Sequence, residues 1–302
     1  MNYKSFFRDP EKRVKLLQAL SFVPDRTMLK LQYRIKLGRK LNLKNPTRYS
    51  EKLQCYKMQY RNPIMHECVD KYSVREYVKA RIGEDYLNLL YGVYTSPDEV
   101  DFDKLPNQFV LKDSMGSNGA LSMIIVTDKT KLDVSEAKKK MEKWVNEPIN
   151  KKNAGREWAY DGRKHRIIAE KLLITDEKGD LPDYKFFCFD GRVFCSYMMV
   201  NYTMHHEEGR LGFFDRDFNM LPVRRTDVSP ITVQPPKPQN YELMVSLAEK
   251  LAEGFPHVRV DFYNIDGKIV FGELTFYTAS GYIRFVPDSF DNEIGEQFIF
   301  PR

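Results

Sequence analysis

Residues 255–282, FPHVRVDFYNIDGKIVFGELTFYTASGY, constrain the fold of this chain more than any other segment. Side chains alternate between the two faces of a β-strand, so Arg259 and Asp261 are expected on one face and the apolar residues between them on the other. Residues 264–267, Asn-Ile-Asp-Gly, predict a tight hairpin turn. The returning strand KIVFGELTF then brings Glu273 back beside Asp261. The segment therefore predicts an antiparallel hairpin that gathers two carboxylates and one guanidinium.

Two neighbouring carboxylates repel each other unless a cation lies between them, and carboxylate oxygens are ligands suited to Mg²⁺. An adjacent arginine adds a fixed positive charge for phosphoryl oxygens or for a developing oxyanion. The alternative is an amphipathic hairpin whose exposed face carries an ordinary ion pair, because Arg and Asp two residues apart on a strand are common. Spacing alone leaves both interpretations open.

The size of the chain permits one large domain or two packed ones, with 302 residues of which 42% are hydrophobic. Its four cysteines form no C-x-x-C pair and no zinc-type spacing, which indicates free thiols in a reducing compartment. The first residues lack the apolar stretch of a signal peptide, and nowhere do about eighteen apolar residues run together. We therefore expect a globular cytoplasmic protein without structural zinc.

The net charge of +6 is concentrated in residues 1–50, which hold 13 Lys and Arg against 3 Asp and Glu. Residues 9–43 within this segment predict two short amphipathic helices. Their apolar stripes are Val14, Leu17 and Leu20 in the first helix and Leu29, Tyr33 and Leu37 in the second. Basic amphipathic helices can lie on anionic lipid or hold an acidic polymer. The alternative is a solvated helical face that packs on the rest of the protein.

Beyond residue 46 the pattern alternates between helical and strand periods without repeats, which predicts a mixed α/β fold. Helices are predicted at residues 50–59, 72–82, 134–145 and 241–251, and strands at residues 108–112, 123–127, 166–173, 184–189 and 192–199. In the last helix, Leu243, Leu247 and Leu251 form a stripe at every fourth position. Gly83 is expected to end the second helix.

Two further stretches are suited to a nucleotide. The strand that ends at Lys112 runs into a Ser- and Gly-rich loop, residues 114–119, whose backbone N–H groups can surround a phosphate. A plain hairpin turn is the alternative for this loop. Residues 166–187 contain an apolar strand whose edge can offer backbone hydrogen bonds to adenine, and the carboxylate that follows, Asp183, can accept hydrogen bonds from ribose hydroxyls. Alone, that segment predicts only a β-hairpin.

Taken in order, these segments resemble the ATP-grasp superfamily, and specifically the TupA-like ATP-grasp family found among bacterial cell-surface polysaccharide genes. The resemblance rests on LNLKNPTRYSEKLQ, VDKYSVREYVKARIG, LLYGVY, DFDKLPNQFVLK, GREWAYDGRKHRIIAEKLL, DYKFFCFDGRVF and FPHVRVDFYNIDGKIVFGELTFY. It implies an α/β (α+β) ATP-grasp fold in which two lobes with antiparallel sheets clasp ATP. The implied division is a basic helical segment at 1–45, an N-terminal lobe with the glycine loop at 46–176 and a C-terminal lobe with the metal site at 177–302.

The resemblance also implies roles for individual residues. The phosphate-binding set is Lys71, which follows Asp70, with Lys112 and the loop residues Ser114, Gly116, Ser117, Asn118 and Gly119. The adenine and ribose set is Glu170, Lys171, Leu173, Asp183 and Lys185. The implied metal ligands are Asp261, Glu273 and Thr275, and the implied catalytic residues are Arg259 and Lys112. Candidates to hold the acceptor are Lys185, Arg210, Arg224 and Arg225, for which a solvated surface is the alternative.

The chain departs from the family pattern at two positions. The superfamily often has asparagine where this chain has Thr275, whose hydroxyl is a shorter and weaker ligand for a second Mg²⁺. The glycine loop of the family typically begins Asn-His-Gly-Ser-Gly, whereas this chain has Asp113 at its start, which brings negative charge toward the phosphates unless the side chain points away. These departures leave open an inactive or specialised member of the family.

The implied function is that of an ATP-dependent carboxylate–amine ligase with ATP and Mg²⁺ as cofactors. It would join an amino acid or amine to a uronic acid or other carboxylate of a cell-surface polysaccharide through an acyl phosphate. The expected partners are small-molecule or glycan carboxylates and amines, with membrane or lipid-linked glycan contact through the basic N-terminal segment and no nucleic acid. The expected location is the cytoplasm, including the inner face of the cell membrane.

Two other classes of protein are weighed against the ligase. A nucleotide-sugar glycosyltransferase would use a D-x-D motif, and the chain has one at residues 101–103 and another at residues 215–217. Both lie in polar or turn-like contexts where acidic residues are common, which disfavours this interpretation. A lipid- or nucleic-acid-binding module would rely on the N-terminal charge. That interpretation is disfavoured because the rest of the chain is net negative and has an organised set of carboxylates.

Overall fold

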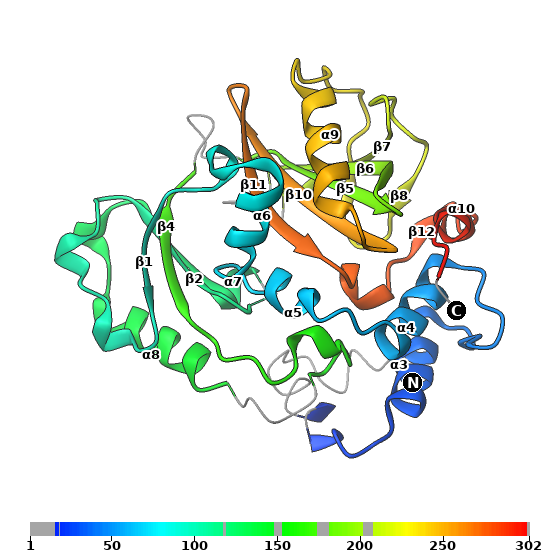
Figure 1. Cartoon of the computed structure of the whole chain (residues 1–302), viewed down its shortest axis with the longest axis horizontal. Coiled ribbons are helices and arrows are strands. Elements are labelled where there is room, and N and C mark those ends of the chain that lie inside the picture. Colours follow the sequence, from blue (N-terminus) through cyan, green and yellow to red (C-terminus); the bar gives the residue numbers. More distant parts are fainter. Residues whose placement is uncertain are drawn as a thin grey trace.

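The computed structural model describes residues 16–17, 19–116, 119–147, 153–173, 181–201 and 208–300. Its helices are α3 (Asp25–Leu37), α4 (Tyr49–Gln59), α5 (Ile64–Cys68), α6 (Val74–Ile82), α7 (Gly119–Ser122), α8 (Val134–Val145), α9 (Tyr241–Ala252) and α10 (Phe290–Gln297). Its strands are β1 (Leu90–Tyr94), β2 (Phe109–Asp113), β3 (Met123–Val126), β4 (Ile167–Lys171), β5 (Asp183–Phe189), β6 (Arg192–Val200), β7 (Arg210–Asp215), β8 (Arg224–Arg225), β9 (Ser229–Pro230), β10 (His257–Ile265), β11 (Lys268–Thr275) and β12 (Phe285–Val286). Figure 1 shows the arrangement of these elements.

The first sheet has four antiparallel strands in the order β1-β4-β2-β3. Helix α8 packs on it through an apolar face that includes Met141 and Trp144, and these residues share a core cluster with Phe109 and Ile167. The helix begins at a side-chain cap, because Asp133 accepts a hydrogen bond from the N–H of Glu136. In Figure 1 this sheet lies on the left with α8 below it.

The second sheet has six strands in the order β11-β10-β5-β6-β7-β9, and all its pairs are antiparallel except β7 with β9. Helix α9 covers one face of the sheet, where it buries Met244 and Leu247 in the same core as Val260 and Phe262. A third sheet consists only of β8 and β12. Because α9 takes one face of the second sheet, the opposite face is left for the charged residues of β10 and β11.

Helices α4 to α6 belong to the core of the second sheet although they precede the first sheet in sequence. Tyr49 in α4 makes an edge-to-face contact with Phe187, with ring centroids 5.9 Å apart. Tyr77 in α6 donates a hydrogen bond to the carbonyl of Leu251 in α9 at 2.8 Å. The division at residue 176 falls between the last strand of the first sheet and the first strand of the second, and the full set of domain boundaries stays a proposal.

Most of the expected elements are confirmed within a few residues. Gly83 has φ +98° and ends α6, and the hairpin turn at residues 266–267 joins β10 to β11. The hydrophobic pattern of the sequence predicted no strand at β7. At β1 the sequence offered only the motif LLYGVY, which contributed to the family resemblance. The prediction that Leu243 belongs to the buried stripe of α9 is wrong, because this side chain is 46% exposed. The face of α9 that packs on the sheet carries Met244, Leu247 and Leu251.

The predicted second helix of the basic segment corresponds to α3, with Leu29, Tyr33 and Leu37 buried. Of the first predicted stripe, Val14 lies outside the described residues. The cysteines are all buried free thiols. None of the helices in the described part of the chain is long and apolar enough to cross a membrane.

Candidate functional site

The β10–β11 hairpin places its charged residues in register. Asp261 pairs with Glu273 across the two strands, and Arg259 pairs with Thr275. The register shifts by one residue between Asp261 and Phe262, opposite Gly272. A Cβ atom at Gly272 would lie 3.1 Å from the carbonyl oxygen of Asp261, so glycine permits this close approach. The predicted neighbourhood of Asp261 and Glu273 is therefore confirmed.

Arg259 joins the acidic side chains of the hairpin. Its Nε and Nη2 donate to the two carboxylate oxygens of Asp261 at 2.7 and 2.6 Å. Nη2 also donates to Glu273 Oε1 at 2.8 Å and to Thr275 Oγ1 at 2.9 Å. The Thr275 hydroxyl in turn donates to Glu273 at 2.8 Å. The guanidinium is buried, 5.9 Å from the centre of the Tyr197 ring, so this is not the exposed ion pair of the simpler interpretation.

Strand β5 adds a second cation and a third carboxylate. Lys185 pairs with Asp261 across β5 and β10, and its Nζ lies 2.6 Å from Asp261 and 2.5 Å from Asp183. Among the described residues, the Oδ1 atom of Asp183 is a buried oxygen without a hydrogen-bond partner. Burial raises the pKa of Asp183 to about 6, with the Asp261 carboxylate adding to the rise and Lys185 opposing it. This carboxylate is therefore only partly compensated.

The pKa values of Glu273 and Lys185 are shifted by the charged side chains around them. Burial would raise the pKa of Glu273, but Arg259, Lys185 and Lys71 lower it to about 2. Burial would lower the pKa of Lys185, but Asp183 and Asp261 raise it well above its usual value. In this row of the second sheet three carboxylates face two cations. Lys71, from outside the sheet, adds a third positive charge that acts on Glu273.

The first sheet contributes a separate charged group. Lys112 Nζ lies 2.9 Å from Glu170 Oε2, and Arg75 of α6 lies 3.4 Å from the other oxygen of Glu170. Burial would lower the pKa of Lys112, but Glu170 raises it, with smaller contributions from Tyr263 and Glu273 of the second sheet. Lys112 is therefore close enough to the β10–β11 hairpin to interact electrostatically with Tyr263 and Glu273.

The remaining residues expected at the adenine lie around the end of β4. The side chain of Lys171 is exposed, its N–H donates to the carbonyl of Leu89, and its carbonyl accepts from Asn88 Nδ2, both at 2.9 Å. Leu173 is half-buried just beyond β4. The structure therefore places Glu170 inward and the side chain of Lys171 outward.

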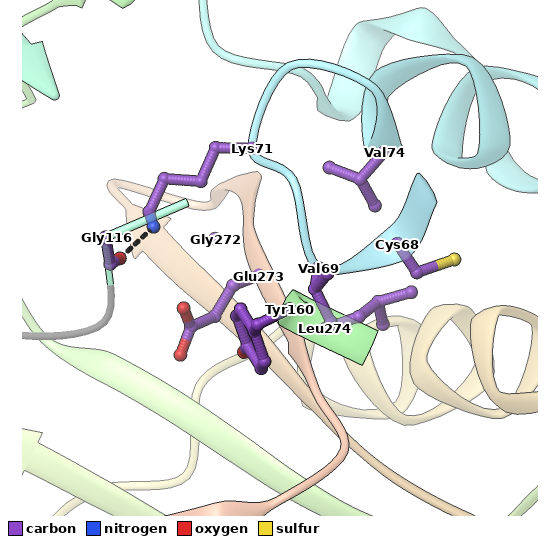
Figure 2. A pocket seen from close by; sticks show the side chains of 9 residues that line it. All are labelled: Cys68, Val69, Lys71, Val74, Gly116, Tyr160, Gly272, Glu273 and Leu274. Atoms are coloured by element: carbon purple, nitrogen blue, oxygen red, sulfur yellow. Dashed lines mark hydrogen bonds between the residues drawn. The ribbon is translucent and has the colours of Figure 1, made fainter. Parts of the chain in front are cut away.

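Lys71 and the start of the glycine loop form one wall of a cavity whose other wall is the hairpin. The backbone N–H of Lys71 donates to Ser114 O at 2.8 Å, and its Nζ donates to Gly116 O. Figure 2 shows Lys71 and Gly116 facing the carboxylate of Glu273, with Tyr160 beside it. Ser117 and Asn118 lie outside the described residues. Gly119 begins the short helix α7 before β3, so the loop is more than a plain hairpin turn.

Asp113 does not extend toward the cavity as a bare charge. It is 5% exposed, and both its carboxylate oxygens lie 2.9 Å from His165 Nδ1. The N–H of Met115 donates to it at 3.0 Å. The Asp113 carboxylate at the start of the loop is therefore hydrogen-bonded within the protein and does not point toward the cavity as an unpaired charge.

Ser114 has a structural partner as well. Its hydroxyl donates to Asp70 Oδ2 at 2.9 Å, and the other oxygen of Asp70 accepts from Arg166 at 3.0 Å and from the N–H groups of Tyr72 and Ser73. Burial would raise the pKa of Asp70, but the Ser73 N–H, Arg166 and Ser114 lower it. Asp70 therefore fixes the segment of Lys71 against the end of β2.

Sequence reasoning missed several residues that the fold brings to this region: Asp70, Arg75, Tyr160, His165, Arg166, Tyr197 and Tyr263. The motifs VDKYSVREY and GRKHRII contain four of them, so the charged residues within the motifs that carry the resemblance were the available signal. Of the acceptor candidates, Lys185 contacts the carboxylates of Asp183 and Asp261. Arg225 is paired with Asp227 at 2.6 Å, and Arg210 and Arg224 are exposed.

The donor set can be tested against the groups that the sequence implied. Within the described ranges, no cluster of three or more His, Cys, Asp or Glu side chains is arranged to hold a metal ion. The opposed pair Asp261 and Glu273 nevertheless fits Mg²⁺ in a nucleotide site, because there the ion uses one or two carboxylates and takes its other ligands from phosphate oxygens and water. The free oxygen of Asp183 fits a hydroxyl donor such as a ribose.

Two large sheets of mainly antiparallel strands, with a cavity between the Lys71–Gly116 region and β11, make up the ATP-grasp fold that the sequence predicted. The family model described as TupA-like ATPgrasp matches residues 51–299. The chain therefore belongs to the TupA-like ATP-grasp family.

Solved structures give a more distant likeness. The chain is similar to an ADP complex of PurK, N5-carboxyaminoimidazole ribonucleotide synthetase, with 12% identity, a TM-score of 0.43, and coverage of 75% of this chain and 50% of that one. D-alanine–D-alanine ligase from Bacillus anthracis has 18% identity and a TM-score of 0.39, with coverage of 70% of this chain and 57% of that one. D-cycloserine synthetase DcsG has 13% identity and a TM-score of 0.40, with coverage of 71% of this chain and 64% of that one. The chain thus spans less than two thirds of the length of each of these structures. Among curated proteins, none matches the sequence.

Proposed function

We propose that this protein is an ATP-dependent carboxylate–amine ligase that forms an amide through an acyl phosphate. The observation that carries the proposal is the cavity where Lys71 and Gly116 lie opposite Glu273. Arg259 adjoins Glu273 and Asp261, and Lys112 faces the same hairpin from the first sheet. Groups suited to phosphates and groups suited to a divalent cation therefore converge from two sheets.

ATP is the phosphoryl donor in this proposal, and Asp261 and Glu273 hold Mg²⁺ together with the phosphate oxygens. When bound, the ion supplies positive charge that stabilises the transferring phosphoryl group. Lys71 and Lys112 bind the phosphates, the Ser114–Gly119 loop covers them, and Asp183 accepts from the ribose. Thr275 acts by orienting the Glu273 carboxylate, to which its hydroxyl donates, rather than as a strong ligand.

The residues around Arg259 serve the transfer itself. A carboxylate oxygen of the acceptor takes the terminal phosphoryl group, and ADP leaves. The nitrogen of an amine then forms the C–N bond as inorganic phosphate leaves and one proton is released. Arg259 is fixed by its contacts with Asp261 and Glu273, so its guanidinium is already oriented when negative charge develops on the transferring oxygens.

The substrates in this proposal are an amino acid or amine and a uronic acid or other carboxylate of a cell-surface polysaccharide precursor. This part rests on the gene context that the family resemblance implies. The glycosyltransferase gains no support from the structure. Asp101 accepts from the N–H of Asp103, and Asp215 accepts from the N–H groups of Asp217 and Asn219, so the first carboxylate of each D-x-D motif caps its own turn.

Thermal shift and chemical trapping together test the proposal. Mg²⁺ with ATP should raise the melting temperature, and Mg²⁺ with a UDP-sugar should not. With ATP, a panel of uronic acids and amino acids, and hydroxylamine, an acyl phosphate would be captured as a hydroxamate. Both responses should disappear in Asp261→Asn. A response to UDP-sugar alone would overturn the ligase proposal, and ATP binding without any hydroxamate would overturn its acyl phosphate step.

A further inference from the structure

The outward face of α3 carries an apolar strip beside a basic strip. Leu31 and Ile35 are one turn apart and are 52% and 40% exposed. Lys30 and Arg34, also exposed and one turn apart, lie beside them because consecutive residues are separated by about 100° around a helix. We call these four residues the α3 face. An exposed helical surface with adjoining apolar and basic strips is the pattern of helices that lie in a membrane interface.

The opposite side of α3 is what attaches the helix to the protein. Leu29 and Tyr33 are buried there, and the Tyr33 hydroxyl lies 2.8 Å from Ser50 Oγ. Gln32 Nε2 donates to the carbonyl of Ala154 at 2.9 Å. In Figure 1, α3 lies at the edge of the molecule beside α4 and away from both sheets. The α3 face is therefore not needed to hold the helix in place.

The helix α3 itself carries an excess of positive charge. The helix has one acidic residue, Asp25, which lies 3.5 Å from Arg156, whereas it has four basic residues. A further apolar side chain, Phe22, is 80% exposed in the segment just before the helix. A surface that combines exposed apolar side chains with an excess of positive charge is complementary to an anionic bilayer.

We propose that the α3 face docks on a bilayer that contains anionic phospholipid. Leu31 and Ile35 enter the headgroup region, and Lys30 and Arg34 contact lipid phosphates. The apolar pair favours lipid over nucleic acid, because binding to a phosphate backbone depends on the cations and gains little from exposed Leu and Ile side chains. This docking does not depend on the ATP chemistry.

The docking has a consequence for the substrate, which rests on the proposed function. Arg156 donates to the carbonyls of Leu20 and Ser21 at 2.7 and 3.1 Å, just before α3. The segment of Arg156 continues to Tyr160, which lines the cavity with Glu273. Residues 156–160 therefore connect the segment just before α3 to the lining of the cavity. This favours a membrane-borne acceptor over a freely diffusing one.

Co-sedimentation of the full chain with lipid vesicles tests the docking. The protein should bind vesicles of phosphatidylcholine mixed with phosphatidylglycerol but not phosphatidylcholine alone, and added salt should weaken the binding. The double variants Leu31→Glu/Ile35→Glu and Lys30→Glu/Arg34→Glu should each lower vesicle binding at least about tenfold. The matched control is Leu243→Glu, at a leucine of α9 that is 46% exposed and lies outside this face, which should bind as the wild type does.

Three results would overturn the proposed docking of the α3 face. Full binding by either double variant would show that its strip is not used. Loss of binding only in Lys30→Glu/Arg34→Glu, together with equal binding of a DNA duplex, would indicate a general polyanion site. A lower melting temperature or an altered elution volume for Leu31→Glu/Ile35→Glu would show that the chain itself or a second copy covers the face. ATP-dependent stabilisation should be the same in all these variants, so a failure of docking and a failure of the ligase proposal are separable.

Discussion

Lys185 and Arg259 share one carboxylate oxygen, Asp261 Oδ2, and the nitrogen of each lies 2.6 Å from it. Asp261 is 1% exposed, so water cannot replace it as a partner for either cation. Glu273 differs, because of these two cations it forms a hydrogen bond with Arg259, at 2.8 Å, and its side chain is 41% exposed. The two expected metal ligands should therefore differ in what they contribute to stability.

Asp261→Asn should lower the free energy of unfolding by about 3 kcal/mol, because it breaks a buried ion pair and leaves two cations undercompensated. Glu273→Gln should lower it by less than Asp261→Asn does, because the partly exposed Glu273 side chain leaves room for water to replace part of its contact with Arg259. Both variants should lose the ATP-dependent thermal shift. Urea unfolding and thermal shift measure the two effects. Equal destabilisation by the two substitutions would contradict the structural distinction between them.

Lys112→Met should weaken ATP binding at least about tenfold, because it removes a charged donor at the phosphates. It also leaves Glu170 with Arg75 at 3.4 Å as its remaining cation. Isothermal titration with ATP and Mg²⁺ measures the affinity. The matched control is Lys131→Met, at an exposed lysine on the turn after β3, which should bind ATP as the wild type does. Unchanged affinity in Lys112→Met would show that this lysine serves only the Glu170 ion pair.

The hairpin was predictable from sequence because alternation and turn chemistry act over neighbouring residues. Arg259, Asp261 and Glu273 lie within 15 residues, and a single Asp-Gly turn sets their register. The strands with Asp-Gly turns or long apolar runs were predictable for the same reason. Strand β7 was not, because its RLGFFD sequence has no clean alternation and its burial is set by β6.

The contacts that fix the start of the glycine loop could not be predicted from neighbouring residues in the sequence. His165 meets Asp113 across 52 residues of sequence, and Ser114 meets Asp70 across 44. Only the antiparallel pairing of β2 with β4 brings the start of β4 to the end of β2. The sequence showed an acidic residue at the loop as a departure from the family pattern, and the structure supplies its partner.

Asp70→Asn should weaken ATP binding by a positioning effect. Asp70 accepts from Ser114 Oγ at 2.9 Å and from Arg166 at 3.0 Å, so an amide in its place loses the charge that orients both donors. The segment of Lys71 is then less firmly held against the loop. We expect a severalfold rise in the KM for ATP that exceeds any change in kcat. A lower melting temperature with an unchanged KM would show that Asp70 has a structural role alone.

Asp183→Asn tests the sign of the electrostatic imbalance. An aspartate in the unfolded chain has a pKa of about 3.9, and burial raises that of Asp183 in the folded protein to about 6. Above pH 6 the carboxylate is ionised in both states and its burial opposes folding, whereas below pH 4 it is protonated in both and the effect is absent. The variant should therefore be more stable than the wild type at pH 7.5, with the difference shrinking toward pH 4, while its affinity for ATP falls. Melting curves from pH 4 to pH 8 measure this, with Asp266→Asn in the exposed turn as the matched control. A variant that is less stable than the wild type at pH 7.5 would show that Lys185 fully compensates this carboxylate and that no second hydrogen-bond donor is needed there.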